Sequence, residues 1–380
     1  MSEHTCDVAV VGGGLVGAAL AYELVTQGVD VLLVDGHHPG RATDAGAGIL
    51  SPETTWNPDE GWFSFGCAAA IHYRTLMRRL ADDGADETGF DECGLLLVAV
   101  DPGEDDWFAT RADLALRRSP DTLVEVTPAE AQALFPPLGN VRRALHNPAA
   151  GRVDGRLMTA AVLHGAEQHG LRRLQATATG LRVEGGGAVA IDTAAGVVSC
   201  GSVALAGGAW SQTFGQQLGV PIPVVPVKGQ IVHMQLPETA PGGAVDSGHW
   251  PIVSPVLNHY LVAWPGGRVV CGGTYEPDAS FDTRSTVAGL EELLRSCLAI
   301  APGLAGATVV DLRVGLRPVS GDDLPVLGPV PGWDNVHLAT GHGTEGLLLG
   351  PYSAALVARC LLGAPVPDEL VPFSVARFMN

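Results

Sequence analysis

The chain has 380 residues, which is enough for a full hydrophobic core and for two domains that share one ligand. Hydrophobic residues make up 46% and charged residues 17%, a composition typical of a globular protein and not of a disordered one. Lys and Arg total 22 against 41 Asp and Glu, and the net charge of −19 would repel phosphate backbones and anionic lipid, so we expect no nucleic-acid partner.

The cysteines and the apolar segments bear on the cellular compartment. The seven cysteines are widely scattered, and none forms a C-x-x-C pair or a pair at zinc-finger spacing from a histidine. They predict buried thiols in a reducing compartment, and no metal site. Because no apolar run reaches about 18 residues, we expect no membrane span and a cytoplasmic location.

The N-terminal segment has the strand–helix–strand order of a parallel βαβ unit. Val8–Val11 is an apolar, β-branched run that predicts a buried strand, and Leu15–Gln27 carries apolar residues at helical intervals. Gly28 ends this helix, and Val29–Val34 predicts a second buried strand that leads into Asp35. This order predicts a Rossmann-type unit.

A glycine motif lies at the turn between the first strand and the helix. Gly12, Gly14 and Gly17 have the G-x-G-x-x-G spacing, which allows a tight turn, a close pyrophosphate and close helix–strand packing, respectively. The helix N-terminus offers N–H donors to phosphates, and Asp35 can accept hydrogen bonds from ribose hydroxyls. The expected dinucleotide contacts are Gly12, Gly14, Leu15, Val16, Gly17, Asp35 and Gly36.

This cradle serves FAD and NAD alike, and later segments separate the two. They are RATDAGAGILS (Arg41–Ser51), VALAGGAWS (Val203–Ser211), VKGQ (Val227–Gln230), GGTYE (Gly272–Glu276), GLRPVSGDDLPVLG (Gly315–Gly328) and LATGHGTEGLLLGP (Leu338–Pro351). With the glycine motif, they resemble the D-amino-acid oxidase and glycine oxidase family of FAD-dependent oxidoreductases, which also includes sarcosine oxidases and bacterial D-amino-acid dehydrogenases. The resemblance runs in order from residue 8 to about 365.

The resemblance implies an α/β fold with two interleaved domains. A discontinuous Rossmann-type FAD-binding domain, with a parallel sheet and helices, would alternate with a smaller α+β substrate domain whose antiparallel sheet covers the flavin ring. The turn-rich segment Ala81–Cys93 and the Pro-rich segment Pro221–Pro226 agree with crossings between them. We expect the FAD-binding domain at residues 1–87, 143–222 and 308–380, and the substrate domain at 88–142 and 223–307.

The resemblance also implies an activity. Such an enzyme oxidises the C–N bond of a small amino acid or related amine by hydride transfer from Cα to flavin N5, and the imine then hydrolyses. The partners would be that substrate and either molecular oxygen or another electron acceptor, and the chain could form a homo-oligomer. No Cys near Arg317 and no His at the N-terminal attachment position match the family's covalent linkages, so we expect non-covalent FAD.

Further cofactor contacts are carried over from the family by position. Thr43 is expected to contact FAD through its side chain, and Gly48 and Ile49 through the backbone; a solvated loop is the alternative for Thr43. The remaining expected contacts are Arg41, Ala42, Ala206, Gly207, Gly208, Trp210, Gly229, Gly315, Arg317, Gly343, Thr344, Gly346 and Leu347.

Arg317 is the candidate anchor for the substrate carboxylate. A guanidinium pairs with both oxygens of a carboxylate, and Arg317 in the GLRP segment matches the family's carboxylate-binding Arg. The alternative is a structural ion pair with an acidic residue. Arg313, four residues earlier, is expected to be a surface residue or a supporting partner.

Two further residues are candidates for the substrate-facing wall. Tyr260 precedes a predicted hairpin at Pro265-Gly266-Gly267, where the family commonly carries a Tyr that binds the substrate carboxylate; a register shift would turn it into the core instead. His259 and Trp264 are weaker candidates. His342, before a predicted helix at Leu347–Leu362, could face substrate or be a buried, hydrogen-bonded histidine.

Departures from the family leave the electron acceptor open. Thr344 stands where some glycine oxidases carry an Arg, and Cys271 stands where sarcosine oxidases place an oxygen-activating Lys near flavin N5. An oxidase, a dehydrogenase with another acceptor and a tailoring flavoenzyme for a specialised amine metabolite therefore all remain. Three other classes of protein fit the sequence less well. An NAD-linked dehydrogenase would not need the C-terminal segments, and a non-enzymatic flavin-binding module would not need Arg317. A flavin monooxygenase usually shows a G-D-A-A-H-type segment where this chain has Gly321-Asp322-Asp323.

Overall fold

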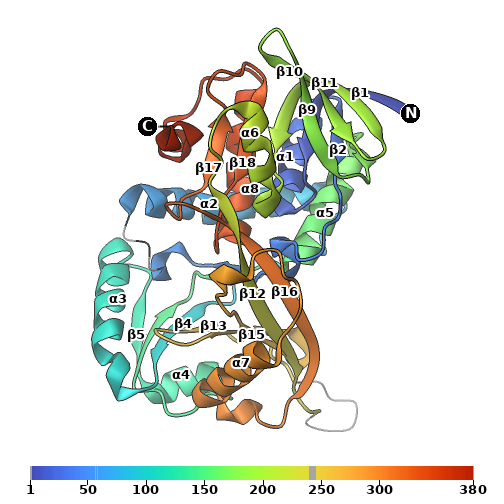
Figure 1. Cartoon of the computed structure of the whole chain (residues 1–380). Coiled ribbons are helices and arrows are strands. Elements are labelled where there is room, and N and C mark those ends of the chain that lie inside the picture. The colour runs from blue at the N-terminus through green and yellow to red at the C-terminus, as the bar shows by residue number, and fades with distance from the viewer. Residues whose placement is uncertain (1, 56, 58, 239–244, 380) are drawn as a thin grey trace.

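The computed structural model describes residues 2–55, 57, 59–238 and 245–379, and within them the chain forms two lobes (Figure 1). Each lobe is built on a sheet of eight described strands. The two sheets meet where the long strands β12 (Val224–Gln235) and β16 (Thr308–Ser320) leave the upper lobe and enter the lower one (Figure 1). The expected mixed α/β architecture is confirmed.

The first sheet has a parallel centre. Its strand β1 (Ser2–Val11) pairs in parallel with β2 (Val31–Val34) on one side and with β11 (Gly196–Leu205) on the other, as expected for buried β-branched runs. The strand order is β17-β18-β11-β1-β2-β8, with β10 and β9 added beside β11. Its other strands are β8 (Arg172–Leu174), β9 (Ala178–Glu184), β10 (Gly187–Thr193), β17 (Val326–Pro329) and β18 (Val336–Thr340).

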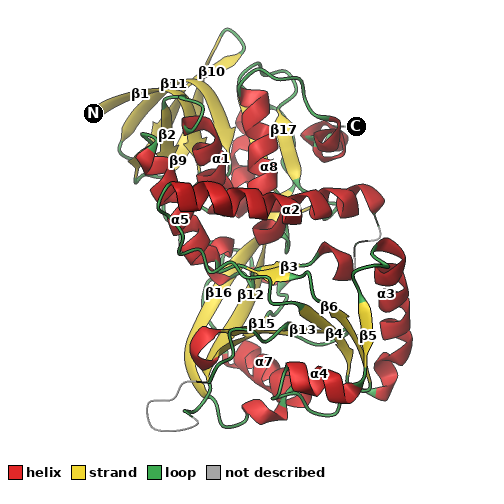
Figure 2. Cartoon of the chain, turned by 180° about the vertical axis from the view of Figure 1, so that it is seen from behind, coloured by secondary structure: helices red, strands yellow, loops and turns green. Residues whose placement is uncertain are grey.

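Apolar helices cover this sheet. Helix α1 (Leu15–Val25) is buried along nearly its whole length between α5 (Gly155–Gln168) and α8 (Gly346–Leu361). The long helix α2 (Glu60–Asp82) crosses below them at the junction of the lobes (Figure 2). There the hydroxyl of Tyr73 donates to the carbonyl of Leu347, which fixes the first turn of α8.

The second sheet is mostly antiparallel. Its order is β16-β12-β15-β14-β13-β4-β6-β5, and the expected hairpin is present as β14 (Tyr260–Trp264) and β15 (Arg268–Gly272), joined at residues 265–267. Helix α7 (Val287–Ile300) covers the face that looks away from the first lobe (Figure 1). The other elements are β4 (Leu95–Ala99), β5 (Val124–Val126), β6 (Arg143–Asn147), β13 (Ile252–Pro255), α3 (Asp105–Arg118), α4 (Pro128–Leu134), the short helix α6 (Gly215–Leu218) and a small β3–β7 pair (Ile49–Leu50 with Gly151–Arg152).

Two of the expected domain boundaries disagree with the strand pairing. Residues 143–147 form β6, which pairs with β4 and β5, and residues 308–320 form β16, which pairs with β12 along its length. Both segments are therefore strands of the second sheet, whereas the expected FAD-binding ranges include them. The cause is non-local hydrogen bonding, which local sequence patterns do not reveal. No helix in the described part of the chain combines the length and apolar character needed to cross a membrane.

Candidate functional site

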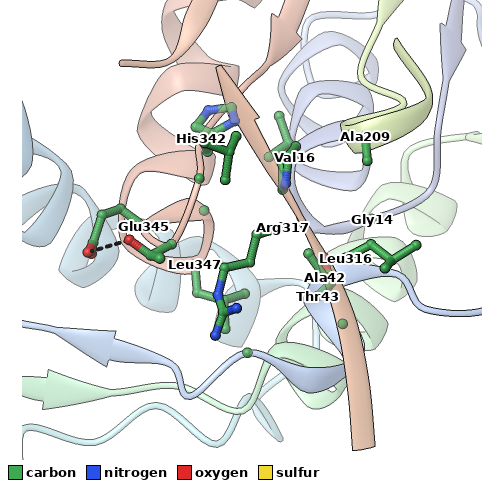
Figure 3. Close-up of a pocket in the computed structure, with 18 of the residues that line it drawn as sticks. Gly14, Val16, Ala42, Thr43, Ala209, Leu316, Arg317, His342, Glu345 and Leu347 are labelled. Atoms are coloured by element: carbon green, nitrogen blue, oxygen red, sulfur yellow. Dashed lines mark hydrogen bonds between the residues drawn. The ribbon is translucent and has the colours of Figure 1, made fainter. Parts of the chain in front are cut away.

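A cavity of about 1210 Å³ lies at the junction of the two lobes. It runs from the glycine turn after β1, past the loop that follows β2, to strands β12, β14 and β16 and the turn before α8 (Figure 3). All residues expected to bind cofactor line it except Gly17, and the three substrate-facing candidates Arg317, Tyr260 and His342 line it as well. The fold thus brings together segments that are more than 300 residues apart in the chain.

The glycine turn leaves no room for side chains. Gly12 has φ +106°, and a Cβ there would lie 2.5 Å from the carbonyl oxygen of Ala206. A Cβ at Gly17 would collide with the carbonyl of Gly12, so Gly17 serves the packing of α1 on β1 rather than the cavity wall.

The N-terminus of α1 points at the cavity. Gly14 is its N-cap and supplies no side-chain cap, while the N–H of Leu15 donates to Thr43 Oγ1 at 3.2 Å. No acidic residue lies in the first helical turn to compete for the positive end of the helix dipole. This end of the cavity is therefore suited to an anionic pyrophosphate.

Asp35, at the end of β2, is held by an arginine. Arg41 Nη1 lies 2.8 Å from Asp35 Oδ2, and its Nη2 donates to the carbonyl of Gly13 at 2.8 Å. Arg41 Nε is buried and has no hydrogen-bond partner in the described part of the chain. The bare glycine turn, the open helix N-terminus and this carboxylate form a cradle that fits the dinucleotide portion of FAD.

Arg317 lies on β16 at the other end of the cavity. Its Nη1 donates to the carbonyls of Thr274 at 2.9 Å and Lys228 at 3.3 Å, while Nη2 makes no hydrogen bond to the described residues. A Cβ at Gly229 would collide with this guanidinium, and one at Gly273 would lie 2.8 Å from Nη2. The described residues give Arg317 no carboxylate partner, and two glycines make room for it beside the cavity (Figure 3).

Tyr260 faces the same space. It is opposite Gly272 in the β14–β15 ladder, and its hydroxyl lies 2.7 Å from where a Cβ of Gly272 would be. Burial raises the pKa of Tyr260 to about 12, although the nearby Arg317 acts against the rise. The side chain is therefore a neutral hydrogen-bond donor at physiological pH.

Of the two weaker candidates for this wall, His259 lines the cavity and Trp264 does not. The ring of His259 lies 2.9 Å from Glu292 on α7, and the guanidinium groups of Arg152 and Arg268 both lie over the ring of Trp264. Arg313 pairs with Asp311 at 2.8 Å and does not line the cavity, in keeping with the supporting place expected for it.

His342 is buried in the turn before α8. Burial lowers the pKa of His342 to about 4, so the imidazole is neutral, and its Nε2 has no hydrogen-bond partner among the described residues. The next residue, Gly343, donates its N–H to the carbonyl of Pro318 at 2.9 Å. This bond ties the turn to β16 just beyond Arg317 and aims the N-terminus of α8 into the cavity.

The sequence reasoning assigned no role in the site to five charged residues that line the cavity, which are Asp59, Arg111, Asp322, Asp323 and Glu345. Glu345, the N-cap residue of α8, lies in the quoted GHGTEG segment but was not singled out, and Arg111 on α3 belongs to no recognised segment. Arg111 is buried and donates from Nε to the carbonyl of Thr54 at 2.9 Å. Burial raises the pKa of Glu345, while Thr344, Arg111 and Arg317 act against the rise.

Cys271 does not lie beside the flavin site, contrary to expectation. Its Sγ contacts the carbonyl of Leu293 on α7 at 3.5 Å, and its neighbour Gly272 lines the cavity instead. Side chains alternate between the two faces of a strand, so Cys271 points away from the cavity. A lysine at this position would start from the face of the sheet that is covered by α7.

Comparisons with known proteins agree with this geometry. Residues 7–360 match the DAO family model, described as FAD dependent oxidoreductase. The chain is 33% identical over 97% of its length to the uncharacterized oxidoreductase YurR of Bacillus subtilis, covering 98% of that protein, and 32% identical to a glycine oxidase of Pseudomonas aeruginosa, with 99% of each chain covered. The crystal structure of iminodiacetate oxidase from Chelativorans sp. BNC1 superimposes with a TM-score of 0.90 at 36% identity, covering 97% of this chain and 98% of that one. The chain belongs to the DAO family of FAD-dependent oxidoreductases.

Proposed function

We propose that this flavoenzyme oxidises the C–N bond of a small amino acid and that Arg317 holds the substrate carboxylate. The observation that carries the proposal is the state of Arg317, which two backbone carbonyls fix through Nη1 while Nη2 remains open beside the cavity. A cation held in this way, without a carboxylate partner in the described part of the chain, is suited to a substrate carboxylate.

Other residues near Arg317 would complete the orientation of the substrate in the cavity. The Tyr260 hydroxyl is neutral and faces the same space, so it can donate a second hydrogen bond to the carboxylate. The neutral His342 and the N-terminus of α8 line the cavity as well. Bound FAD supplies the two-electron acceptor chemistry, and these residues fix which hydrogen of the substrate is presented to it.

The charged residues that line the cavity favour a second candidate substrate, an amine with two carboxylates. Arg111 is a further cation that lines the cavity, and Glu345 is near enough to Arg111 and Arg317 for each to act on its pKa. A secondary amine that carries two carboxylates complements a positive–negative–positive lining. The 36% identity to a protein named iminodiacetate oxidase supports this candidate, and the glycine oxidases at about the same level support a monocarboxylic one.

The test is anaerobic reduction of the bound flavin, followed by its absorbance. Glycine, sarcosine, D-alanine and iminodiacetate are compared with methylamine and dimethylamine, which lack the carboxylate. We expect at least one carboxylated amine to bleach the flavin and the carboxylate-free amines to fail. Equal reduction by carboxylate-free amines, or no reduction by any carboxylated amine, would overturn the proposal. Readmitting air then separates an oxidase, which is re-oxidised quickly, from a dehydrogenase with another acceptor.

A further inference from the structure

Glu345 is an acidic side chain that lines the cavity together with Arg111 and Arg317. It lies at the N-terminal end of α8, on the same side of the cavity toward which Arg317 extends (Figure 3). Thr344 donates a hydrogen bond to Glu345 Oε1 at 3.1 Å, and Oε2 accepts none from the described residues. One oxygen is therefore held in place and the other remains open to a ligand.

Two positive charges act on the carboxyl of Glu345. Arg111 reaches the cavity from α3 and Arg317 from β16, and both act electrostatically on the carboxyl of Glu345. Among the described residues, however, Arg317 forms no ion pair with Glu345. The gap between a carboxylate and a nearby guanidinium is the place where a zwitterion fits, with its carboxylate on the arginine and its ammonium on the glutamate.

Two other titratable side chains that line the cavity, His342 and Tyr260, are neutral at pH 7. Burial lowers the pKa of His342 to about 4, and burial raises that of Tyr260 to about 12. Both are neutral between these values. Burial raises the pKa of the Glu345 carboxyl above its ordinary value, which makes it a better proton acceptor than an exposed carboxylate.

We propose that Glu345 binds the ammonium group of the substrate and accepts one of its protons. The inference rests on the proposed function and names a further catalytic residue for it. An N–H bond of the ammonium breaks, an O–H bond forms at the open oxygen of Glu345, and the two opposite charges disappear together. The nitrogen keeps the electron pair of the broken bond, and this lone pair stabilises the carbon from which hydride departs.

The experiment compares Glu345→Gln with the wild-type holoenzyme in two measurements under argon. The first is the affinity for glycine and for acetate, its amine-free counterpart, followed by calorimetry or by the flavin absorbance before reduction. We expect Glu345→Gln to weaken glycine binding at least about tenfold and to leave acetate binding unchanged or tighter, because only glycine brings a cation to position 345. A wild type with no preference for glycine over acetate would overturn the proposal, as would equal changes for both ligands.

The second measurement is the pH dependence of flavin reduction by the best substrate. At pH 7 the variant should reduce its flavin about 100-fold more slowly, the scale of a lost general base. Its rate should then rise about tenfold per pH unit up to the pKa of the free amine, since the substrate must now arrive deprotonated. A loss that is the same at every pH would show a structural role only and would sink the proposal.

Matched variants distinguish a loss of the Glu345 carboxylate from a general effect on folding, and the ligand comparison distinguishes this proposal from the proposed function. Glu345→Asp keeps a carboxylate and should restore the wild-type pH profile in part, and Glu92→Gln makes the same change at an exposed ion pair with Arg74 and should change nothing. Should the wild type not be reduced by any carboxylated amine, the proposed function fails, while the ratio of glycine to acetate affinity still decides the place of Glu345.

Discussion

Arg41 binds the carboxylate of Asp35 at 2.8 Å and, through its second terminal nitrogen, the backbone carbonyl of Gly13. One guanidinium thus links the acid at the end of β2 to the glycine turn after β1. The acid and the turn are the two parts of the cradle that a dinucleotide must contact together, and their separation is fixed before the cofactor binds. Such preorganisation reduces the ordering that binding requires.

Replacing Asp35 tests whether it contacts the adenosine ribose. We expect Asp35→Ala to weaken FAD binding about 10- to 150-fold, because one hydrogen bond to a charged group contributes roughly 1.5–3 kcal/mol. The measurement is the dissociation constant of FAD for the apoprotein. Asp44→Ala is the control, since Asp44 lies 3.8 Å from Arg41 Nε without lining the cavity. Unchanged affinity in Asp35→Ala would refute the ribose assignment.

Replacing Arg317 tests the substrate anchor. Arg317→Ala should still purify with FAD, while kcat/KM for amino acids should fall by at least about 3 kcal/mol because the substrate carboxylate loses its partner. Arg317→Lys should recover only part, since an ammonium cannot reproduce the planar fork. Steady-state kinetics and flavin content are measured side by side. Amino-acid turnover that survives Arg317→Ala would remove the main support for this substrate class.

Replacing Gly229, which lies beside the Arg317 guanidinium, tests whether the position of Arg317 matters without removing any charge. Gly229→Ala adds a methyl group where the guanidinium lies, so the arginine must shift. We expect at least a tenfold loss in kcat/KM, in line with the sensitivity of catalysis to small displacements. Gly306→Ala is the matched control because a Cβ there meets nothing within 4 Å. Equal activity of the two variants would show that the exact place of Arg317 is unimportant.

The hydroxyl of Tyr260 can be removed without changing the ring. Tyr260→Phe should weaken binding of carboxylated substrates about 10- to 150-fold, the range for one hydrogen bond to a charged group. Since the pKa of Tyr260 is raised to about 12, its ionisation should contribute no limb to the wild-type pH–rate profile between pH 6 and 10. Substrate affinity is read from the concentration dependence of anaerobic flavin reduction. If Tyr260→Phe binds substrate as the wild type does, the residue serves packing instead.

His337 predicts how stability depends on pH. Burial lowers its pKa to about 4, and its Nδ1 has no partner among the described residues. Above pH 6.5 the histidine is neutral in both states, but between pH 6.5 and 4 the unfolded chain binds the proton first, so stability falls by up to about 3 kcal/mol. His337→Leu should flatten this part of the stability curve measured by urea unfolding. The same acid slope in wild type and variant would contradict the assignment.

Local sequence patterns predicted the elements around the nucleotide end well. The helix expected at Leu15–Gln27 is observed at Leu15–Val25, and the one expected at Leu347–Leu362 is observed at Gly346–Leu361. The first strand is longer than the apolar run Val8–Val11, because residues from Ser2 onward pair with β11. These elements are predictable because apolar periodicity and glycine positions act over a few residues.

The reacting end depended on long-range contacts. Whether Tyr260 or Cys271 faces the cavity was set by strand register, since side chains alternate between the two faces of a sheet, and the structure places Tyr260 inside and Cys271 behind. Arg111 carries no local signal, because its place in the cavity results from α3 packing against the loop at Thr54.

The sequence by itself therefore determined the family, the FAD cofactor and the positions of the glycine turn, Asp35 and Arg317, since each is encoded in a contiguous motif. Only the tertiary structure decided which charges share the cavity. Glu345, Arg111 and Arg317 come from three elements that are separated by as many as 234 positions in the chain (345 − 111). Electrostatic interactions depend on distance in space and not on distance along the chain, so no pattern of neighbouring residues could reveal this arrangement.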